Sequence, residues 1–164
     1  MTTTELAAPK LDKNDPDVIV QAYKFALKPT ATQERKLRQH TGAARFAYNR
    51  LIAQWRDDIH TRIEEKERGI SEDELTPFSF KCSFYDMNNY WNRVKRECAP
   101  WYSEVSKNIG NDAARRAHDS IKNWYDSRSG KRKGRRMGFP GFHKRGYHES
   151  CTFCLLYTSL MARG

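Results

Sequence analysis

Residues 127–145 constrain the fold of this chain more than any other stretch, because they concentrate positive charge. The stretch reads SRSGKRKGRRMGFPGFHKR and contains eight Lys or Arg residues with no Asp or Glu. A run this basic repels itself when it is compacted, so it needs a polyanion as counter-charge. Phe139 and Phe142, with Pro140 between them, indicate a shaped surface that docks on the rest of the chain. The stretch therefore predicts a nucleic-acid partner.

The charge of the whole chain supports this prediction. Its 164 residues carry a formal net charge of +10, which favours phosphate-rich partners over acidic proteins or a membrane surface. Residues 107–145 contain twelve basic and three acidic side chains, whereas residues 57–74 contain eight acidic and three basic ones. We therefore expect one face that binds phosphate and another that faces solvent.

The sequence also excludes several classes of protein. No window approaches the roughly 18 apolar residues needed to span a bilayer. The N-terminus lacks the basic and apolar regions of a secretory signal. The cysteines are therefore expected to be reduced thiols of a cytoplasmic protein; they are Cys82, Cys98, Cys151 and Cys154.

Both ends of the chain are predicted to be non-helical. Residues 1–17 lack periodicity and are expected to form a disordered leader. Residues 18–29 are rich in β-branched and aromatic residues and close on Pro29, which predicts a strand. Residues 127–153 are expected to hold the basic loop and, from residue 148, a second strand.

The block between them, residues 30–126, is predicted to be helical. Helices are expected over residues 30–40, 43–68, 83–97 and 105–125, with a tight turn at Thr41 and Gly42. Thr30 with Gln33 predicts a capping box, Ser83 an N-cap and Gly69 a C′ residue. Two apolar stripes at helical spacing are expected in the core: Phe46, Leu51, Ile52, Trp55, Ile59 and Ile63, then Val105, Ile109, Ala113, Ala117, Ile121 and Trp124. The order of elements indicates an α+β fold, mainly α, with a helical insertion in a β-domain.

Five motifs carry a resemblance to a known family. They are YKFALKPT at residues 23–30, GAARFAYN at 42–49, PWYSEV at 100–105, AHDSIKNWY at 117–125 and GFPGFHK at 138–144. In this order and spacing, over about residues 20–153, they resemble the N-terminal part of the OrfB/TnpB family of transposon-encoded RNA-guided nucleases, relatives of type V CRISPR effectors.

The resemblance carries expectations about fold and function. It implies a helix-turn-helix-like recognition lobe inserted between strands of an incomplete β-barrel, which together bind a guide RNA and double-stranded target DNA. The family's magnesium-dependent RuvC-type nuclease and its zinc ribbon lie further C-terminal, so this chain is expected to be neither an enzyme nor a holder of cofactors. A prokaryotic, nucleoid-associated cytoplasmic location is implied.

The last residues raise a separate hypothesis. Residues 154–159, CLLYTS, are what the nucleotide sequence TGTCTCTTATACACATCT encodes, which resembles a transposon end used to fragment DNA for sequencing libraries. Residues 154–164 are therefore interpreted as an adapter-derived, non-native tail.

Three groups of residues are the candidates for nucleic-acid binding. The first, in the opening turns of the long helix, is predicted to dock phosphate at a helix N-terminus: Arg45, Tyr48, Asn49 and Arg50. In the alternative interpretation Phe46 and Tyr48 pack in the core and the arginines are solvated.

The second group shares one face of the last helix. Lys107, Asn111 and Arg115 are four residues apart, and the resemblance places Lys107 and Asn111, joined by Asn88, where the motif beside the DNA target is read. Lys favours guanine and Asn favours adenine; the alternative is a solvated polar face.

The third group is the basic stretch itself, in which the release of counterions from nucleic acid explains the charge. Its members are Lys131, Arg132, Lys133, Arg135, Arg136, His143, Lys144 and Arg145. The alternative is a flexible solubilising linker. Phe139 and Phe142 are expected to pack in the barrel. His143, His148, Cys151 and Cys154 have a spacing that zinc could use, but no second ligand pair follows, so no metal site is predicted.

Two functions from different classes remain open. One is the N-terminal piece of an RNA-guided nuclease, which retains guide and target binding. The other is a free-standing helix-turn-helix regulator that binds duplex DNA. The first prefers structured RNA and the second prefers a defined DNA site, so the partner discriminates between them.

Overall fold

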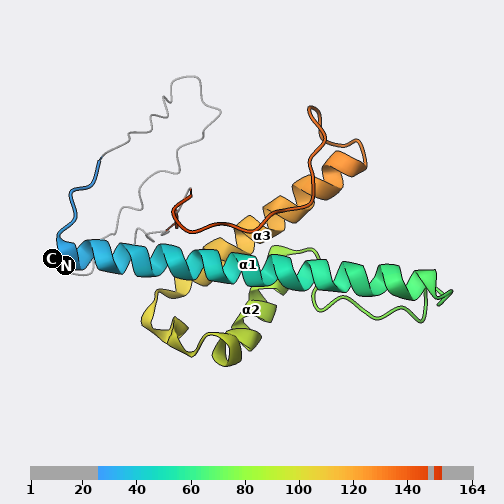
Figure 1. Cartoon of the computed structure of the whole chain (residues 1–164), viewed down its shortest axis with the longest axis horizontal. Helices are drawn as coiled ribbons and strands as arrows, with labels where there is room; N and C mark the ends of the chain where they lie inside the picture. The colour runs from blue at the N-terminus through green and yellow to red at the C-terminus, as the bar shows by residue number, and fades with distance from the viewer. Residues whose placement is uncertain (1–25, 148–149, 153–164) are drawn as a thin grey trace, which may run out of the picture.

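The computed structural model describes residues 26–147 and 150–152. The helices of this part are α1 (Ala31–Glu67), α2 (Phe84–Cys98), the 3-10 helix η1 (Pro100–Glu104) and α3 (Lys107–Arg128). Figure 1 shows α1 running the length of the molecule, with α3 crossing it obliquely and α2 on the opposite side from the loop that follows α3. None of these helices combines the length and apolarity needed to cross a bilayer.

The expected α+β fold with an incomplete β-barrel is wrong for the part of the chain that the structure describes. No residue within 26–147 or 150–152 lies in a strand. After α3 the backbone is irregular, and side chains of α1 and α3 bind it in place of a neighbouring strand. The expected leader, most of the first strand and the tail fall on residues 1–25 and 153–164, outside the described residues.

The start and end of α1 follow the sequence signals. The Thr30 capping box is confirmed: the Gln33 amide donates to Thr30 Oγ1 at 3.4 Å, and the Thr30 amide donates to Gln33 Oε1 at 2.9 Å. Gly69 is confirmed as the C′ residue with φ 82°, and its amide donates to the Lys66 carbonyl at 3.0 Å. The Ile70 amide donates to the Glu65 carbonyl at 3.1 Å, which completes a Schellman motif.

The turn expected at Thr41 and Gly42 is wrong, because α1 continues through both residues. Thr41 Oγ1 donates to the carbonyl of Arg38 at 3.1 Å, so its hydroxyl is satisfied inside the helix. A Cβ at Gly42 would meet no described atom within 4 Å, so this glycine marks neither a turn nor a close approach. The helix of 37 residues is about 55 Å long.

Small side chains allow α1 and α3 to pack closely. Their contact is lined by alanines that are each at most 4% exposed: Ala43, Ala44 and Ala47 on α1, and Ala113, Ala114 and Ala117 on α3. Gly110, one turn before Ala113 and Ala114, accommodates the indole of Trp91 from α2. The three helices thus share a single core cluster.

The apolar stripes were predicted in part. Leu51, Ile52 and Trp55 are buried on α1, whereas Phe46 and Ile63 are 36% and 48% exposed. On α3 the stripe from Ile109 to Ile121 is buried as expected. Ser83 is confirmed as the N-cap of α2, with the Asp86 amide donating to its hydroxyl at 3.1 Å.

Candidate nucleic-acid interface

A return segment, residues 137–147, follows the basic loop and lies along α1. The side-chain amide of Asn49 binds its backbone with two hydrogen bonds. Asn49 Nδ2 donates to the His143 carbonyl at 3.0 Å, and the His143 amide donates to Asn49 Oδ1 at 2.8 Å. A carboxamide has the donor and acceptor of a peptide group, so Asn49 satisfies the His143 amide and carbonyl as the backbone of a neighbouring strand would.

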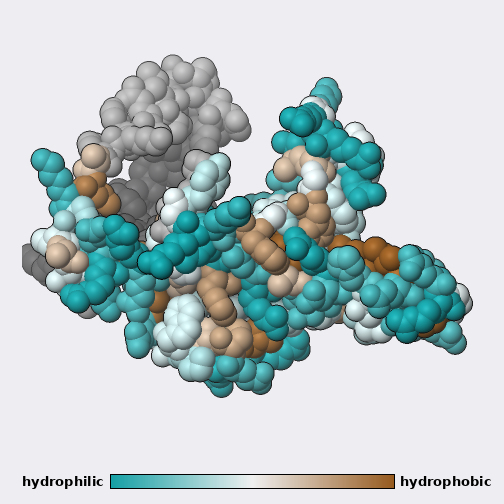
Figure 2. Space-filling model, viewed as in Figure 1, coloured by the Kyte–Doolittle hydropathy of each residue, from teal (hydrophilic) through white to brown (hydrophobic). Residues whose placement is uncertain are grey.

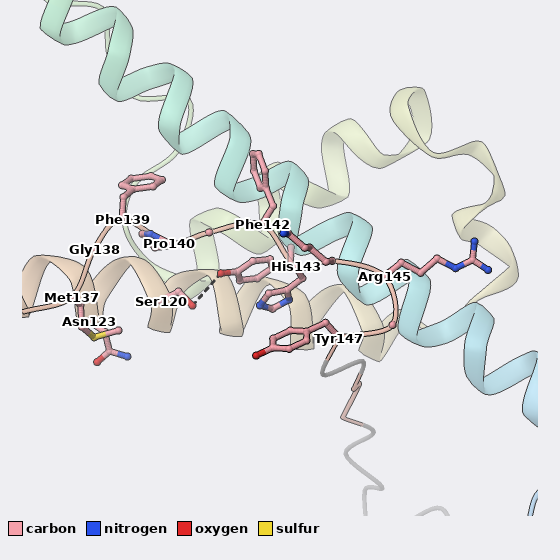
Figure 3. A pocket seen from close by; sticks show the side chains of 14 residues that line it. Ser120, Asn123, Met137, Gly138, Phe139, Pro140, Phe142, His143, Arg145 and Tyr147 are labelled. Atoms are coloured by element: carbon pink, nitrogen blue, oxygen red, sulfur yellow. Dashed lines mark hydrogen bonds between the residues drawn. The ribbon is translucent and has the colours of Figure 1, made fainter. Parts of the chain in front are cut away.

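His143 is also positioned by an aromatic stack. Its ring lies parallel to that of Tyr48, with 3.8 Å between centroids and 4° between planes. The Tyr48 hydroxyl donates to Ser120 Oγ on α3 at 3.4 Å, which is the dashed line in Figure 3. Burial raises the pKa of Tyr48, against a smaller opposing effect of the Ser120 hydrogen bond. Tyr48 is therefore a neutral phenol that links α1, α3 and the return segment.

The phenylalanines of this segment pack on helices, which corrects the expectation that they pack in a barrel. The Arg56 guanidinium lies over both rings, 5.3 Å from the Phe139 centroid and 4.6 Å from that of Phe142. It also donates to the Pro140 carbonyl at 3.4 Å. The edge of Trp124 meets Phe139 at 5.2 Å between centroids. Pro140 is buried beside them.

These contacts enclose a groove between α3 and the return segment, with a volume of about 890 Å³. Tyr48, Ser120 and Asn123 form its helical wall, and residues 137–147 form the rest. In Figure 3, His143 and Tyr147 lie next to each other, whereas Arg145 points away from the groove. Tyr147 is 69% exposed and Phe142 is 47% exposed, so aromatic surface is available beside the cations.

The basic loop, residues 129–136 between α3 and the return segment, forms an arm that projects from the end of α3 (Figure 1). Two hydrogen bonds hold the base of this loop: the Arg132 amide donates to the Asp126 carbonyl at 3.0 Å, and the Met137 amide donates to Ser127 Oγ at 2.8 Å. Gly130 and Gly134 have φ of 76° and 105°, which allows the sharp reversal. The projecting arm is largely hydrophilic in Figure 2.

The five predicted cations of this loop are exposed, and no hydrogen bond or ion pair joins their side chains to any other described residue. They are Lys131, Arg132, Lys133, Arg135 and Arg136. Five cations on one short loop without a carboxylate partner leave a strongly positive arm. Their role in binding stays a prediction.

The predicted residues of α3 form a separate surface with α2. Lys107, Asn111 and Arg115 are exposed, and the Arg115 guanidinium lies 4.6 Å from the ring centroid of Phe84 at the start of α2. Phe84 lies near Arg115, and Trp91, further along α2, lies near the earlier residue Gly110 of α3, so the two helices run antiparallel. Asn88 lies between Phe84 and Trp91 on the same helix face, so it shares this edge with Asn111.

The first predicted group is divided by the structure. Asn49 and Tyr48 hold the return segment, and Arg45 lies near it. Arg50 instead lies near Tyr90 of α2: burial raises the pKa of Tyr90, and the positive charge of Arg50 partly opposes that rise. Nε of Arg50 and Oδ1 of Asn88 are buried without a hydrogen-bond partner among the described residues. Binding of nucleic acid by this group stays a prediction.

Sequence reasoning missed Arg56 and Arg116. Arg116 forms an ion pair with Asp112 at 3.0 Å and donates to Ser150 Oγ at 2.8 Å. The Thr152 amide donates to Asp112 Oδ2 at 3.2 Å. The i, i+4 spacing of Asp112 and Arg116 was the available signal for this pair, whereas nothing in the sequence around Arg56 marked it.

No three His, Cys, Asp or Glu side chains of the described residues converge as metal ligands do. His148 and Cys154, two of the four residues with zinc-like spacing, lie outside the part that the structure describes.

Comparisons with known proteins bear on the family. Residues 19–64 match the model of a helix-turn-helix domain of the OrfB/IS605 type. Two Mycobacterium tuberculosis proteins, from strains CDC 1551 and H37Rv and each named as a candidate RNA-guided DNA endonuclease, are 34% identical to this chain over 135 residues. The match covers 77% of this chain and 27% of each relative, so the chain spans about a quarter of their length.

No solved structure matches the chain. The described part of the matched domain is continuous helix from Ala31. The domain match and the two relatives confirm the resemblance found in the motifs. The chain belongs to the OrfB/TnpB family and carries the N-terminal, helix-turn-helix region of that family.

Proposed function

We propose that this chain binds a guide RNA and double-stranded target DNA, as the N-terminal part of an RNA-guided DNA endonuclease. The observation that carries the proposal is the arm of five exposed cations beside a groove with exposed aromatic side chains. The relatives' names supply the reaction class, and the region matched here is a helix-turn-helix domain, a class that binds nucleic acid.

RNA is assigned to the arm and the groove. Single-stranded and looped RNA is bound by cations that follow the backbone and by aromatic faces that stack on unpaired bases. The loop supplies the cations, and Phe142 and Tyr147 supply exposed rings within the groove. The groove volume of about 890 Å³ is large enough for unstacked bases, which a flat helix surface does not offer.

Duplex DNA is assigned to the α2–α3 edge. Lys107 and Asn111 are exposed on consecutive turns of α3, and such side chains hydrogen-bond guanine and adenine edges respectively. Asn88 lies at the same edge, but its amide oxygen is buried, so Lys107 and Asn111 carry the assignment. The two surfaces lie on different parts of α3, so both ligands can bind at once.

The test is the salt dependence of binding by the full chain. Changing the five loop cations to Gln is expected to lower the slope of log K against log salt for single-stranded RNA by about 3.5, since each phosphate contact contributes about 0.7. The control changes five other exposed cations to Gln, Lys28, Arg35, Lys36, Lys66 and Arg68, for the same net charge. Equal losses in both variants would show that the arm is not the site.

The alternative, a free-standing regulator, is favoured by the helix-turn-helix match alone. It predicts binding to duplex DNA that neither RNase treatment nor the five loop substitutions weaken. Such a result would reject guide RNA as the partner.

A further inference from the structure

A narrow notch lies where α1, α3 and the return segment meet, next to the groove and separate from the α2–α3 edge. Its walls come from all three parts of the fold, with residues on α1, on α3 and after α3. The lining residues are Thr41, Ala44, Arg45, Tyr48, Arg116, His143, Lys144, Tyr147 and Ser150. Its volume is about 10 Å³, which is the space of a single oxygen-sized group. A base does not fit there.

Three cationic side chains line the notch. Arg45 from α1, Arg116 from α3 and Lys144 from the return segment converge on it, and none of its described lining residues is a carboxylate. The carboxylate of Asp112, which does not line the notch, pairs with Arg116 at 3.0 Å. The Ser150 hydroxyl, whose oxygen accepts from Arg116 at 2.8 Å, adds a neutral donor to the same walls.

The pKa of His143 depends on the charges that line the notch. Burial lowers the pKa of its ring, and the positive charge of Arg116 lowers it further. The groups that face it are Tyr48, Asn49 and Arg45 on α1, Arg116 on α3, and Lys144 and Tyr147 on its own segment. An anion between these cations would reverse the electrostatic effect and favour the imidazolium form.

We propose that this notch is a phosphate site, which takes one phosphate oxygen between Arg45, Arg116 and Lys144 while His143 becomes the fourth cation. The assignment of this phosphate to a polynucleotide rests on the proposed function; the site itself rests on the geometry. Its place beside the groove would fix the backbone of a strand whose bases occupy the larger space. Binding then takes up a proton at His143.

The test follows the histidine ring resonances of the full chain by NMR across pH, in phosphate and in chloride at matched ionic strength. Phosphate is expected to raise the pKa of His143 by about one unit or more, as a close opposite charge does. His60 and His118 are internal controls, because neither lines the notch. Arg45→Gln should remove the response and Arg45→Lys should keep most of it. A response equal in Arg45→Gln and the parent chain overturns the site.

Oligonucleotides distinguish the source of the phosphate and separate this site from the proposed function. One RNA sequence is compared with a 5′-phosphate and with a 5′-hydroxyl. Equal responses of His143 indicate a backbone diester, and a response to the phosphorylated strand alone indicates a terminal monoester. If strands bind without changing the pKa of His143, the phosphate site in the notch is refuted, whereas nucleic-acid binding by the chain is not. A response to inorganic phosphate without binding of any strand keeps the notch and rejects the proposed function.

Discussion

Two glycines of the helical core should respond in opposite directions to the same substitution. Gly110 and Gly42 both lie inside helices, so replacing either with Ala gains about 1 kcal/mol of helix propensity. At Gly110 the new Cβ would lie 2.9 Å from Trp91 Cδ1 and Nε1. At Gly42 it would meet no described atom within 4 Å. The gain in helix propensity is the same in both variants, so the difference between their free energies of unfolding measures the cost of packing a methyl group against Trp91.

The indole of Trp91 has little room to move away. Trp91 is fully buried, and its ring packs edge-on against Tyr102 and Phe46, at 4.9 Å and 6.3 Å between centroids. Insertion of a methyl group into a packed core costs about 1–3 kcal/mol. Gly110→Ala should therefore be less stable than Gly42→Ala by about 1–3 kcal/mol, with Gly42→Ala more stable than the parent chain.

Urea unfolding followed by tryptophan fluorescence measures this difference. With a slope of about 1–3 kcal/mol per molar urea, the two midpoints should differ by about 1 M. The slopes must agree for the comparison to hold, because a changed slope indicates a changed unfolded or native state. Equal midpoints would refute the close approach of α2 and α3, and with it the placement of Asn88 beside Asn111.

Three further predictions concern the return segment. Asn49→Ala removes two hydrogen bonds and should cost about 1–3 kcal/mol, with faster tryptic cleavage at Lys144 and unchanged cleavage at Lys66; equal protection would show that Asn49 does not hold the segment. Arg56→Met should cost about 1 kcal/mol in urea unfolding, since two cation–π contacts are lost and the aliphatic stem is kept, while Arg56→Lys should cost less. Burial, and to a smaller extent Arg116, lower the pKa of His143 in the folded chain, so the unfolded chain binds the proton more readily. The contribution of His143 to the free energy of unfolding is therefore fully present above the unfolded pKa of about 6.5 and is lost as the pH drops below it. His143→Gln should flatten this fall between about pH 7 and pH 5, and an unchanged pH profile would contradict it.

The capping residues of the helices could be predicted from the sequence, whereas the continuity of α1 through residues 41–42 could not. Side chains at the caps act locally, so Thr30, Ser83 and Gly69 could be identified from their neighbours alone. Gly42 was misread as a turn because a helical glycine has the same signature, and only the tertiary structure shows that α1 continues. The barrel was carried over from the resemblance, whereas the described return segment is held by side chains of α1 and α3.

The candidate site was predictable in composition but not in arrangement. The basic loop could be found because charge density is a property of sequence alone. The groove could not, because it depends on Asn49 and Arg56 meeting residues more than 80 positions away. Tyr48 and Asn49 look like surface ligands in a motif, yet their side chains are engaged within the chain. Long-range pairings of this kind leave no periodic signal in a single sequence.

The continuity of α1 changes the physical origin of anion attraction at Arg45. A helix that begins at residue 43 would offer unpaired backbone N–H groups and a partial positive charge there. In the structure α1 begins at Ala31, so Arg45 lies several turns inside a helix whose amides are already bonded. Attraction must then come from side chains, namely Arg45, Arg116 and Lys144. Replacing all three with Gln should therefore abolish the phosphate response of His143, whereas a helix terminus would retain part of it.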